Sequence, residues 1–257
     1  MKEWKVGVVG GGVVGQAMNK MCQGKAQIYD PHLPLTSNSK EQVNECDIAF
    51  ICVPTPMMKN GACDTSIVEE SVKWLKTPLI VIRSTVAPGT SERLSHQFKK
   101  RVVFQPEYLG ETPAHMFTDM SQRDFVVLGG KTEDCIEVAN FYKCFYNSLV
   151  HFHFCDWMTA ELCKYMENAF YAMKVVFVNE WYDIATAHGV PFDILREAWL
   201  ADTRISRDHT FVYPDKRGFS GKCLPKDCNA IVYSSKQRGF DPLFMKSCLE
   251  INDKLTS

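Results

Sequence analysis

The first 155 residues alternate between short apolar runs and longer segments in which apolar residues recur at helical spacing. Several of the short runs are almost continuously apolar, as expected for parallel strands that are buried on both faces. The predicted strands are Lys5–Val9, Ala26–Tyr29, Asp47–Val53, Leu79–Ile82, Val102–Phe104, Phe125–Leu128 and His151–Phe154. The predicted helices between them are Val13–Gln23, Ile67–Lys76, Gly89–Lys99 and Lys131–Tyr146. This alternation predicts an α/β fold, with a Rossmann-type, doubly wound parallel sheet over residues 1–155.

From residue 156 onward the pattern is helical. Asp156–His188 has no internal Gly or Pro and is predicted to be one long helix, followed by helices at Phe192–Ala201 and Pro242–Leu255. The sequence therefore predicts a smaller, all-helical domain over residues 156–257. An apolar stripe along the long helix indicates burial, either in a core or against a partner subunit. The stripe consists of Leu162, Met166, Phe170, Met173, Phe177 and Trp181.

Polar residues follow the ends of several predicted strands, where ligands bind in doubly wound sheets. These residues are Thr55, Ser84, Thr85, Glu107 and Glu111. Each is a candidate for ligand contact, although each could instead cap the next helix. On the long helix, Lys164 and Asn168 lie four residues apart and share one face. The residues alone favour the interpretation that Lys164 is a surface lysine paired with Glu161.

A glycine-rich turn connects the first strand to the first helix. Gly10, Gly12 and Gly15 stand in the GxGxxG register, and Asp30 ends the second strand. The three glycines permit a tight turn, close approach of a pyrophosphate and close packing of helix on strand. A carboxylate at position 30 can accept from both ribose hydroxyls and would repel a 2′-phosphate. The pattern predicts an NAD site and favours NAD over NADP.

Composition narrows the class of protein. The formal net charge is −1, so no basic field points to nucleic acid or to an acidic membrane surface. The N-terminus has no signal-peptide pattern, and no apolar run reaches spanning length. The eleven cysteines form no CxxC pair and suit reduced thiols in a cytoplasmic compartment. No cluster of metal ligands stands out, and His151 and His153 alternate as on a strand.

The segment GFSGKCLPKD at residues 218–227 differs from the surroundings of the other cysteines. It reads as a glycine-rich loop that places Cys223 beside Lys222, Lys226 and Asp227. Nearby cations favour the thiolate, which is the nucleophilic form of cysteine. From local chemistry alone, Cys223 is either a reactive thiol or a plain loop cysteine.

Taken together, these motifs resemble the UDP-glucose/GDP-mannose dehydrogenase family, and the resemblance extends over nearly the whole chain. The matching segments occur in the family's order, and the last is the most specific. They are GGGVVG (10–15), ICVPTP (51–56), RSTVAPGT (83–90), PEYLGE (106–111), AELCKYMENAFYAMKVVFVNE (160–180), DTRI (202–205) and GFSGKCLPKD (218–227).

The resemblance implies oxidation of the C6 alcohol of a nucleotide sugar, with UDP-glucose favoured, to a carboxylate by two NAD⁺ in turn. It implies that Cys223 captures the aldehyde as a thiohemiacetal and then carries a thioester. Lys164 and Asn168 would stabilise developing oxyanions, and Asp227 would act as acid/base group with a water. Thr85 and Glu107 would position that water.

The resemblance also implies which residues contact the ligands. The expected NAD contacts are Gly10, Gly12, Val13, Val14, Gly15, Asp30, Thr55, Thr85, Glu111 and Lys226. The expected substrate contacts are Glu107, Tyr108, Leu109, Lys164, Asn168, Arg204, Phe219 and Gly221. It further implies a homodimer through the long helix, in which Arg204 reaches the neighbouring subunit's site.

The sequence departs from the family pattern in three places. Ser220 replaces a glycine, the segment between Asp30 and Asp47 is short, and the chain stops at Ser257. Family members continue into a second Rossmann-like domain that grips the nucleotide, so we expect weak substrate binding or a partner chain that supplies this surface. Two other functions stay open. One is a β-hydroxyacid-type dehydrogenase that needs no cysteine; the other is a non-catalytic NAD-binding or dimerisation module that modulates a full-length relative.

Overall fold

The computed structural model describes residues 3–33, 37–110, 119–120, 123–146 and 149–257. The chain divides into two compact units. The first comprises residues up to Pro56 together with Cys63–Lys164, and the second comprises Met57–Ala62 and Tyr165–Ser257. The division falls inside the long helix. No helix in the described ranges is long and apolar enough to cross a membrane.

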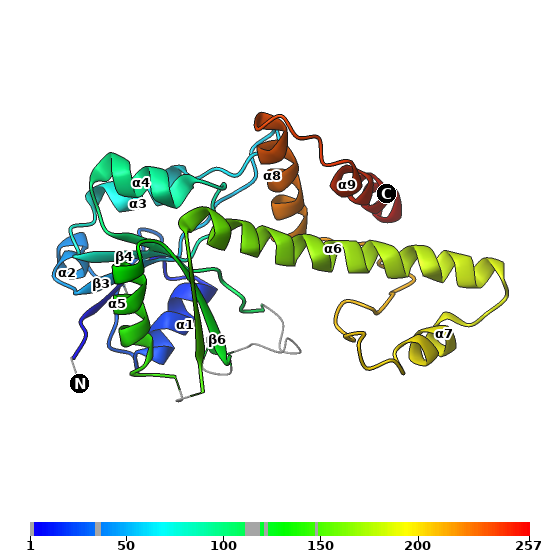
Figure 1. Cartoon of the computed structure of the whole chain (residues 1–257), viewed down its shortest axis with the longest axis horizontal. Coiled ribbons are helices and arrows are strands. Elements are labelled where there is room, and N and C mark those ends of the chain that lie inside the picture. The colour runs from blue at the N-terminus through cyan, green and yellow to red at the C-terminus, as the bar shows by residue number, and fades with distance from the viewer. Residues whose placement is uncertain (1–2, 34–36, 111–118, 121–122, 147–148) are drawn as a thin grey trace. The chain divides into compact units, whose positions relative to one another are not determined.

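The first unit contains a seven-stranded sheet in the order β2-β1-β3-β4-β5-β6-β7. Strands β3, β4 and β6 of this sheet are labelled in Figure 1. All neighbouring strands run parallel except β5 and β6, which form one antiparallel pair through Phe104 and Gly129. The sheet is therefore mostly parallel, as expected, with a reversal that the apolar pattern does not encode. The strands are β1 (Val6–Val9), β2 (Gln27–Tyr29), β3 (Ile48–Ile51), β4 (Leu79–Ile82), β5 (Val102–Phe104), β6 (Phe125–Gly129) and β7 (His151–Cys155).

Helices cover both faces of this sheet, and successive strand residues point alternately into two cores. One core packs Val8, Phe50 and Val81 against α1 (Val13–Met21) and α5 (Thr132–Tyr142). The other packs Ile51 and Ile82 against the opposite set of helices. That set is α2 (Lys40–Asn44), α3 (Ser66–Trp74), α4 (Thr90–Phe98) and the start of α6 (Trp157–Ala187). Strands buried on both faces must be apolar throughout, which explains their unbroken apolar runs.

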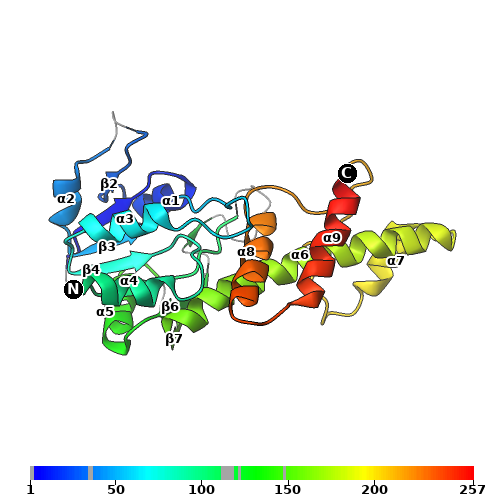
Figure 2. The ribbon, with the colours of Figure 1, turned by 90° about the horizontal axis from the view of Figure 1, so that it is seen from above.

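The second unit is helical. It contains most of α6, together with α7 (Phe192–Trp199), α8 (Leu224–Gln237) and α9 (Leu243–Thr256). Figure 2 shows α8 and α9 beside this part of α6. A small core joins them, formed by Ala172 and Val176 from α6, Phe219, Cys228 from α8 and Cys248 from α9.

The prediction that residues 223–227 form a loop is wrong, because these residues begin helix α8. The glycine-rich segment ends at Cys223, which is the N-cap of α8, and Lys226 and Asp227 lie in its first turn. Pro225 suits the first turn because its missing N–H would have no partner there. The prediction failed because glycine and proline are signals of both loops and helix starts.

The apolar stripe of α6 is largely exposed in the single chain. The side chains of Met166, Phe170 and Phe177 are 78%, 53% and 44% exposed, whereas Met173 packs against the small core of the second unit. Of the two interpretations of the stripe, burial in the chain's own core therefore fails for these three residues.

Candidate active site

The glycine turn after β1 has the backbone geometry that the motif predicts. Gly10 has φ +97°, and a Cβ atom there would clash with the Cys52 carbonyl. A Cβ on Gly15 would clash with the Gly10 carbonyl, so α1 can pack closely on β1 only with glycine at this position. A Cβ on Gly12 would have no protein atom within 4 Å. The motif therefore combines two positions that packing requires with one that faces open space.

These residues fit a dinucleotide. Gly12 and Val13 are exposed at the N-terminus of α1, and Val14 is half-buried, so backbone N–H groups are available to an anion at this end of the helix. The half-buried Asp30 follows β2, and its Oδ2 accepts from Gly11 N at 2.7 Å. This bond fixes the carboxylate next to the turn, where a ribose would be recognised.

The ends of β3 and β4 are joined by hydroxyl groups. Thr55 is buried, and its Oγ1 donates to the Thr85 carbonyl at 2.7 Å. Ser84 Oγ donates to the Val53 carbonyl and accepts from Val53 N, at 2.7 and 2.9 Å. Neither Ser84 nor Thr85 is the N-cap of the next helix, α4, which begins after Gly89. Glu111, the remaining strand-end candidate, lies outside the described residues.

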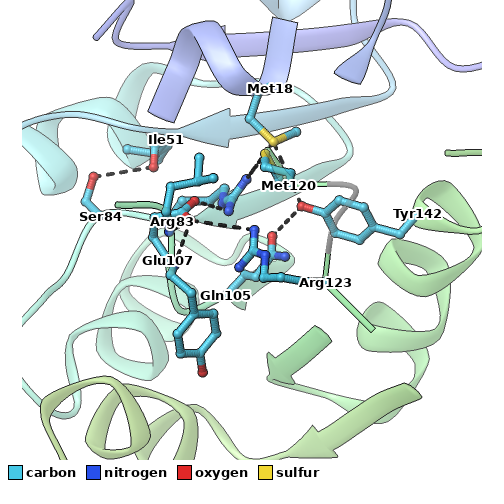
Figure 3. A network of polar contacts seen from close by, with 11 residues as sticks. Met18, Ile51, Arg83, Ser84, Gln105, Glu107, Met120, Arg123 and Tyr142 are labelled. Atoms are coloured by element: carbon cyan, nitrogen blue, oxygen red, sulfur yellow. Dashed lines mark hydrogen bonds and ion pairs between the residues drawn. The ribbon is translucent and has the colours of Figure 1, made fainter. Parts of the chain in front are cut away.

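Glu107 belongs to a buried polar network that sequence reasoning did not anticipate (Figure 3). Its Oε2 pairs with Arg83, which is 2% exposed and also directs Nη1 toward the sulfurs of Met18 and Met120 at 2.7 and 3.2 Å. Its Oε1 lies 3.6 Å from Arg123 Nη2. Two arginines therefore face one carboxylate in the interior of the first unit.

The same carboxylate also organises the backbone that follows it. Glu107 Oε1 accepts from Tyr108 N and Leu109 N, each at 2.6 Å. Burial alone would raise the pKa of Glu107, but the charges of Arg83 and Arg123 and the two N–H donors outweigh burial and hold the pKa below its usual value. Glu107 is therefore an ionised anchor for residues 107–109.

Lys164 lies half-buried on α6, in the turns that belong to the first unit. Its Nζ is 5.2 Å from the ring centroid of Tyr108, within the range of a cation–π contact. Glu161, the partner in the surface-pair interpretation of Lys164, is fully buried. It accepts from Gly89 N at 2.5 Å and Ser91 N at 2.8 Å, so it caps the N-terminus of α4. Burial raises the pKa of Glu161 against the effect of these donors.

In the second unit, α6 and α8 bring together three of the predicted residues. Asn168 Nδ2 donates to Asp227 Oδ2 at 2.5 Å, and both side chains are buried. Lys226 Nζ donates to the other carboxylate oxygen of Asp227, also at 2.5 Å. A buried carboxylate is retained in a fold only with such partners. Lys226, expected to contact NAD, is thus an ion-pair partner of Asp227.

Cys223 is exposed and stands at the N-cap of α8, where backbone N–H groups and the helix dipole favour negative charge. Its carbonyl accepts from Asp227 N at 2.9 Å, which ties the cysteine to the first turn that carries Asp227. Gly221, two residues earlier, has φ +88° and open space around it. An accessible thiol therefore stands at the N-cap of the helix whose first turn carries the buried Asp227 carboxylate.

The segment before the cysteine is anchored to α9. Phe219 is 4% exposed, its N donates to Asn252 Oδ1 at 2.6 Å, and its carbonyl accepts from Asn252 Nδ2 at 3.1 Å. A Cβ on Gly218 would lie 2.7 Å from the same Asn252 oxygen. The ring of Phe219, an expected substrate contact, packs in the core of the second unit.

Arg204, the remaining expected substrate contact, lies on the surface. Its side chain is 87% exposed and pairs with Asp202 at 2.6 Å. The nearby loop is fastened to α6 by Lys174, whose Nζ donates to the Ser206 carbonyl and hydroxyl at 3.0 and 3.2 Å. Within the single chain, Arg204 is thus held near the helix and directed to solvent.

Sequence reasoning missed four residues that hold these groups: Arg83, Arg123, Glu161 and Asn252. Arg83 directly follows an apolar strand, which predicts its place at the carboxyl edge of the sheet, but nothing in the sequence predicts that it pairs with Glu107. Asn252 carried a clearer signal. It lies four residues after Cys248, on the buried face of α9, where an apolar side chain would be expected. A polar residue in that stripe predicts a specific hydrogen bond.

Comparison with known proteins identifies the family that both halves resemble. Residues 19–149 match the model of the NAD binding domain of the UDP-glucose/GDP-mannose dehydrogenase family. Residues 158–254 match the model of the central domain of the same family. The chain thus contains the NAD-binding domain that the glycine motif predicted.

Individual relatives agree with these matches. A putative UDP-glucose 6-dehydrogenase of Bacillus subtilis is 29% identical over 237 residues, covering 86% of this chain and 54% of the relative. The UDP-glucose 6-dehydrogenase of Pseudomonas aeruginosa is 28% identical over 258 residues, covering 89% and 56%. The chain therefore spans about half the length of these curated relatives. A solved UDP-glucose dehydrogenase from Pyrobaculum islandicum aligns with a TM-score of 0.82 at 26% identity, over 98% of this chain and 68% of that structure.

Proposed function

We propose that this chain, which belongs to the UDP-glucose/GDP-mannose dehydrogenase family, oxidises the C6 alcohol of a nucleotide sugar to a carboxylate. UDP-glucose is the first substrate to test, because the relative from Pseudomonas aeruginosa is named a UDP-glucose 6-dehydrogenase and that from Bacillus subtilis a putative one. The observation that carries the proposal is the group of Asn168, Lys226 and Asp227 at the helix start that bears the exposed Cys223.

The glycine turn and Asp30 would hold the NAD. Gly10, Gly12, Val13, Val14 and Gly15 would bind its pyrophosphate through the N-terminus of α1, and Asp30 would accept from its ribose hydroxyls. Thr55, Thr85, Glu111 and Lys226 complete the expected contacts. Bound NAD⁺ supplies a hydride acceptor, and two molecules in turn take up the four electrons that separate an alcohol from a carboxylate.

Cys223 would act as the covalent nucleophile. Its thiolate adds to the carbon of the C6 aldehyde and forms a C–S bond, which gives a thiohemiacetal. Oxidation of that adduct leaves a thioester. Attack by water then breaks the C–S bond, releases the carboxylate and returns the thiolate. The exposure of Cys223 and its place at the α8 N-terminus support this role.

Lys164 and Asn168 would stabilise the negative charge that develops on the C6 oxygen. Both are N–H donors, and they lie four residues apart on α6. Asp227 would act as the acid/base group with a water molecule, with Thr85 and Glu107 as the residues that position that water. Glu107, Tyr108, Leu109, Arg204, Phe219 and Gly221 complete the proposed substrate contacts.

The proposal includes a homodimer formed through α6. Its support is the exposed apolar stripe, in which Met166 and Phe170 are 78% and 53% exposed. In such a dimer, Arg204 would reach the neighbouring subunit's site. Met166→Glu is then expected to lower the mass measured by sedimentation equilibrium from dimer to monomer, and a wild-type monomer at all concentrations would contradict the dimer.

The test is the appearance of NADH when the chain is mixed with NAD⁺ and a nucleotide sugar. UDP-glucose, GDP-mannose and UDP-N-acetyl-mannosamine would be compared at rising concentration. A thermal-shift panel with the same sugars identifies binding, because a ligand that binds only the native state raises the melting temperature. Binding of NAD⁺ without turnover of any sugar would favour a non-catalytic module. Turnover that persists in Cys223→Ala would favour a β-hydroxyacid-type dehydrogenase.

A further inference from the structure

Tyr108 lies at the centre of a cluster of charged and aromatic side chains in the first unit. Its ring centroid is 5.2 Å from Lys164 Nζ and 5.6 Å from the Arg123 guanidinium carbon. The rings of Phe125 and Tyr108 pack in a T-shaped arrangement with their centroids 5.1 Å apart, and Tyr108 is 8% exposed. A desolvated aromatic ring attracts cations more strongly than an exposed one. The ring is thus placed to hold the Lys164 ammonium.

Contacts of the Tyr108 backbone and hydroxyl fix the position of this ring. Tyr108 N donates to Glu107 Oε1, and Glu107 is in turn held by the buried Arg83 (Figure 3). Tyr108 Oη also lies 3.8 Å from Cys163 Sγ, the neighbour of Lys164 on α6. Tyr108 therefore has contacts through its backbone N–H, its ring and its hydroxyl, which leave the ring little freedom of motion.

The backbone that carries Lys164 is fixed as well. Trp157 Nε1 donates to the Val102 carbonyl at 2.8 Å, and Glu161 is bound by two backbone N–H groups at the start of α4. What remains adjustable is the four-carbon lysine side chain itself. A lysine that stabilises an oxyanion contributes most when its ammonium is already in place, because no reorganisation is then needed during the reaction.

We propose that Tyr108 is a positioning residue, whose ring face holds the ammonium of Lys164 where the developing oxyanion needs it. The inference rests on the proposed function for the role of Lys164. This role is separate from the proposed substrate contact of Tyr108 and has its own readout, since a substrate contact acts on KM, whereas the position of Lys164 acts on kcat.

Fluorinated phenylalanines at position 108 test the contact at nearly constant shape. Each added fluorine withdraws electron density from the ring face and weakens cation binding. Relative to Tyr108→Phe, 4-fluoro-, 3,5-difluoro- and 3,4,5-trifluorophenylalanine should lower kcat stepwise, by about three- to tenfold across the series, with KM nearly constant. An unchanged kcat, or a change confined to KM, would overturn the inference. Unfolding midpoints of the series check that the fold is intact.

A second readout does not depend on turnover. In protein with ¹³C at lysine Cε, the Cε protons of Lys164 should resonate upfield because of the Tyr108 ring current, with the signal assigned through Lys164→Arg. The shift should persist in Tyr108→Phe and disappear in Tyr108→Leu. An identical Lys164 signal in all three proteins would overturn the inference. If the upfield shift is present and no sugar is turned over, the positioning contact stands and the proposed function fails.

Discussion

Asn168 Nδ2 donates to Asp227 Oδ2 at 2.5 Å, although 59 residues separate the two in the chain. The bond joins α6 to the first turn of α8, and both side chains are buried. Lys226 occupies the second oxygen of Asp227. The two helices therefore present one carboxylate, held by an amide and an ammonium, at the start of the helix that carries Cys223.

Asp227→Asn should reduce kcat by about 10²- to 10⁴-fold, because the variant keeps the shape of the side chain but loses the acid/base group. It also removes the charge that Lys226 faces, so the melting temperature should fall. Steady-state kinetics and thermal unfolding measure both effects. Asp241→Asn is the matched control, since Asp241 pairs with Lys246 on the surface at 2.9 Å. If the two variants have similar kcat values, Asp227 has no part in the chemistry.

Two glycines of the same turn should respond to alanine in opposite ways. Gly15→Ala should destabilise the protein, because its Cβ would clash with the Gly10 carbonyl. Gly12→Ala should leave the unfolding midpoint of the ligand-free protein nearly unchanged, since Gly12 has φ −72° and open space beside it. It should nevertheless weaken NAD⁺ binding by about tenfold or more, because the methyl group would occupy the approach of the pyrophosphate.

Calorimetric titration measures the affinity of each variant for NAD⁺, and urea unfolding measures its stability. If Gly12→Ala binds NAD⁺ as tightly as the wild type, Gly12 does not lie on the approach of the pyrophosphate. A Gly12→Ala protein that unfolds as readily as Gly15→Ala would also contradict it, because the loss of affinity would then follow from damage to the fold.

The Glu107 carboxylate should make stability depend on pH. Burial acts to raise its pKa, but Arg83, Arg123 and the N–H groups of Leu109 and Tyr108 hold the pKa below its usual value. As pH falls, the Glu107 carboxylate is therefore protonated in the unfolded chain before it is protonated in the folded protein. The stabilisation is complete above the ordinary carboxyl pKa of about 4.3 and is lost as pH falls through the lower folded value.

Glu107→Gln should cost about 3–5 kcal/mol at pH 7, because it leaves two arginines without their buried anion. The difference from the wild type should shrink between pH 5 and the acid limit of the folded state. Urea unfolding at a series of pH values measures it, with the exposed Glu92→Gln as control. A difference that stays constant over this range would show that Glu107 is not the titrating group.

Asn252→Ala should release the segment that leads to Cys223. The variant loses both hydrogen bonds between Asn252 and the Phe219 backbone. The buried N–H and carbonyl of Phe219 then lack these partners, which should lower the free energy of unfolding by about 1–3 kcal/mol. The alkylation rate of Cys223, followed by peptide mass spectrometry, should change as its loop loosens. Asn140→Ala, at an exposed site on α5, should leave both stability and the alkylation rate unaltered. If the two variants have the same stability and the same Cys223 alkylation rate, Asn252 does not hold the segment that leads to Cys223.

Most of the fold could be predicted from the chain because its strands are apolar runs and its helices are periodic. Leu79–Ile82 and Val102–Phe104 were predicted with the boundaries that the structure has. The antiparallel pairing of β5 with β6 could not be predicted, since strand direction depends on how the intervening chain crosses the sheet. Helix α8 was missed because its first turn contains the Gly- and Pro-rich signals of a loop.

The residues of the candidate site also fall into those that the sequence predicts and those that it does not. Positions marked by a motif, such as Gly10 or Cys223, could be named from sequence because the local backbone dictates them. Residues that act through a distant partner could not. Arg83 and Glu107 are 24 residues apart and meet only because β4 and β5 are neighbours in the sheet. Likewise, Asn252 is 33 residues from the Phe219 backbone that it holds.

Cys223 is proposed to carry a nucleotide sugar through two oxidations. The most direct measurement is the number of NADH formed per nucleotide sugar consumed, for the wild type, Cys223→Ala and the exposed-cysteine control Cys144→Ala. Covalent catalysis by Cys223 predicts two NADH per sugar for the wild type and the control, and a loss of about 10³-fold or more in turnover for Cys223→Ala. One NADH per sugar, or turnover that survives in Cys223→Ala, would contradict it.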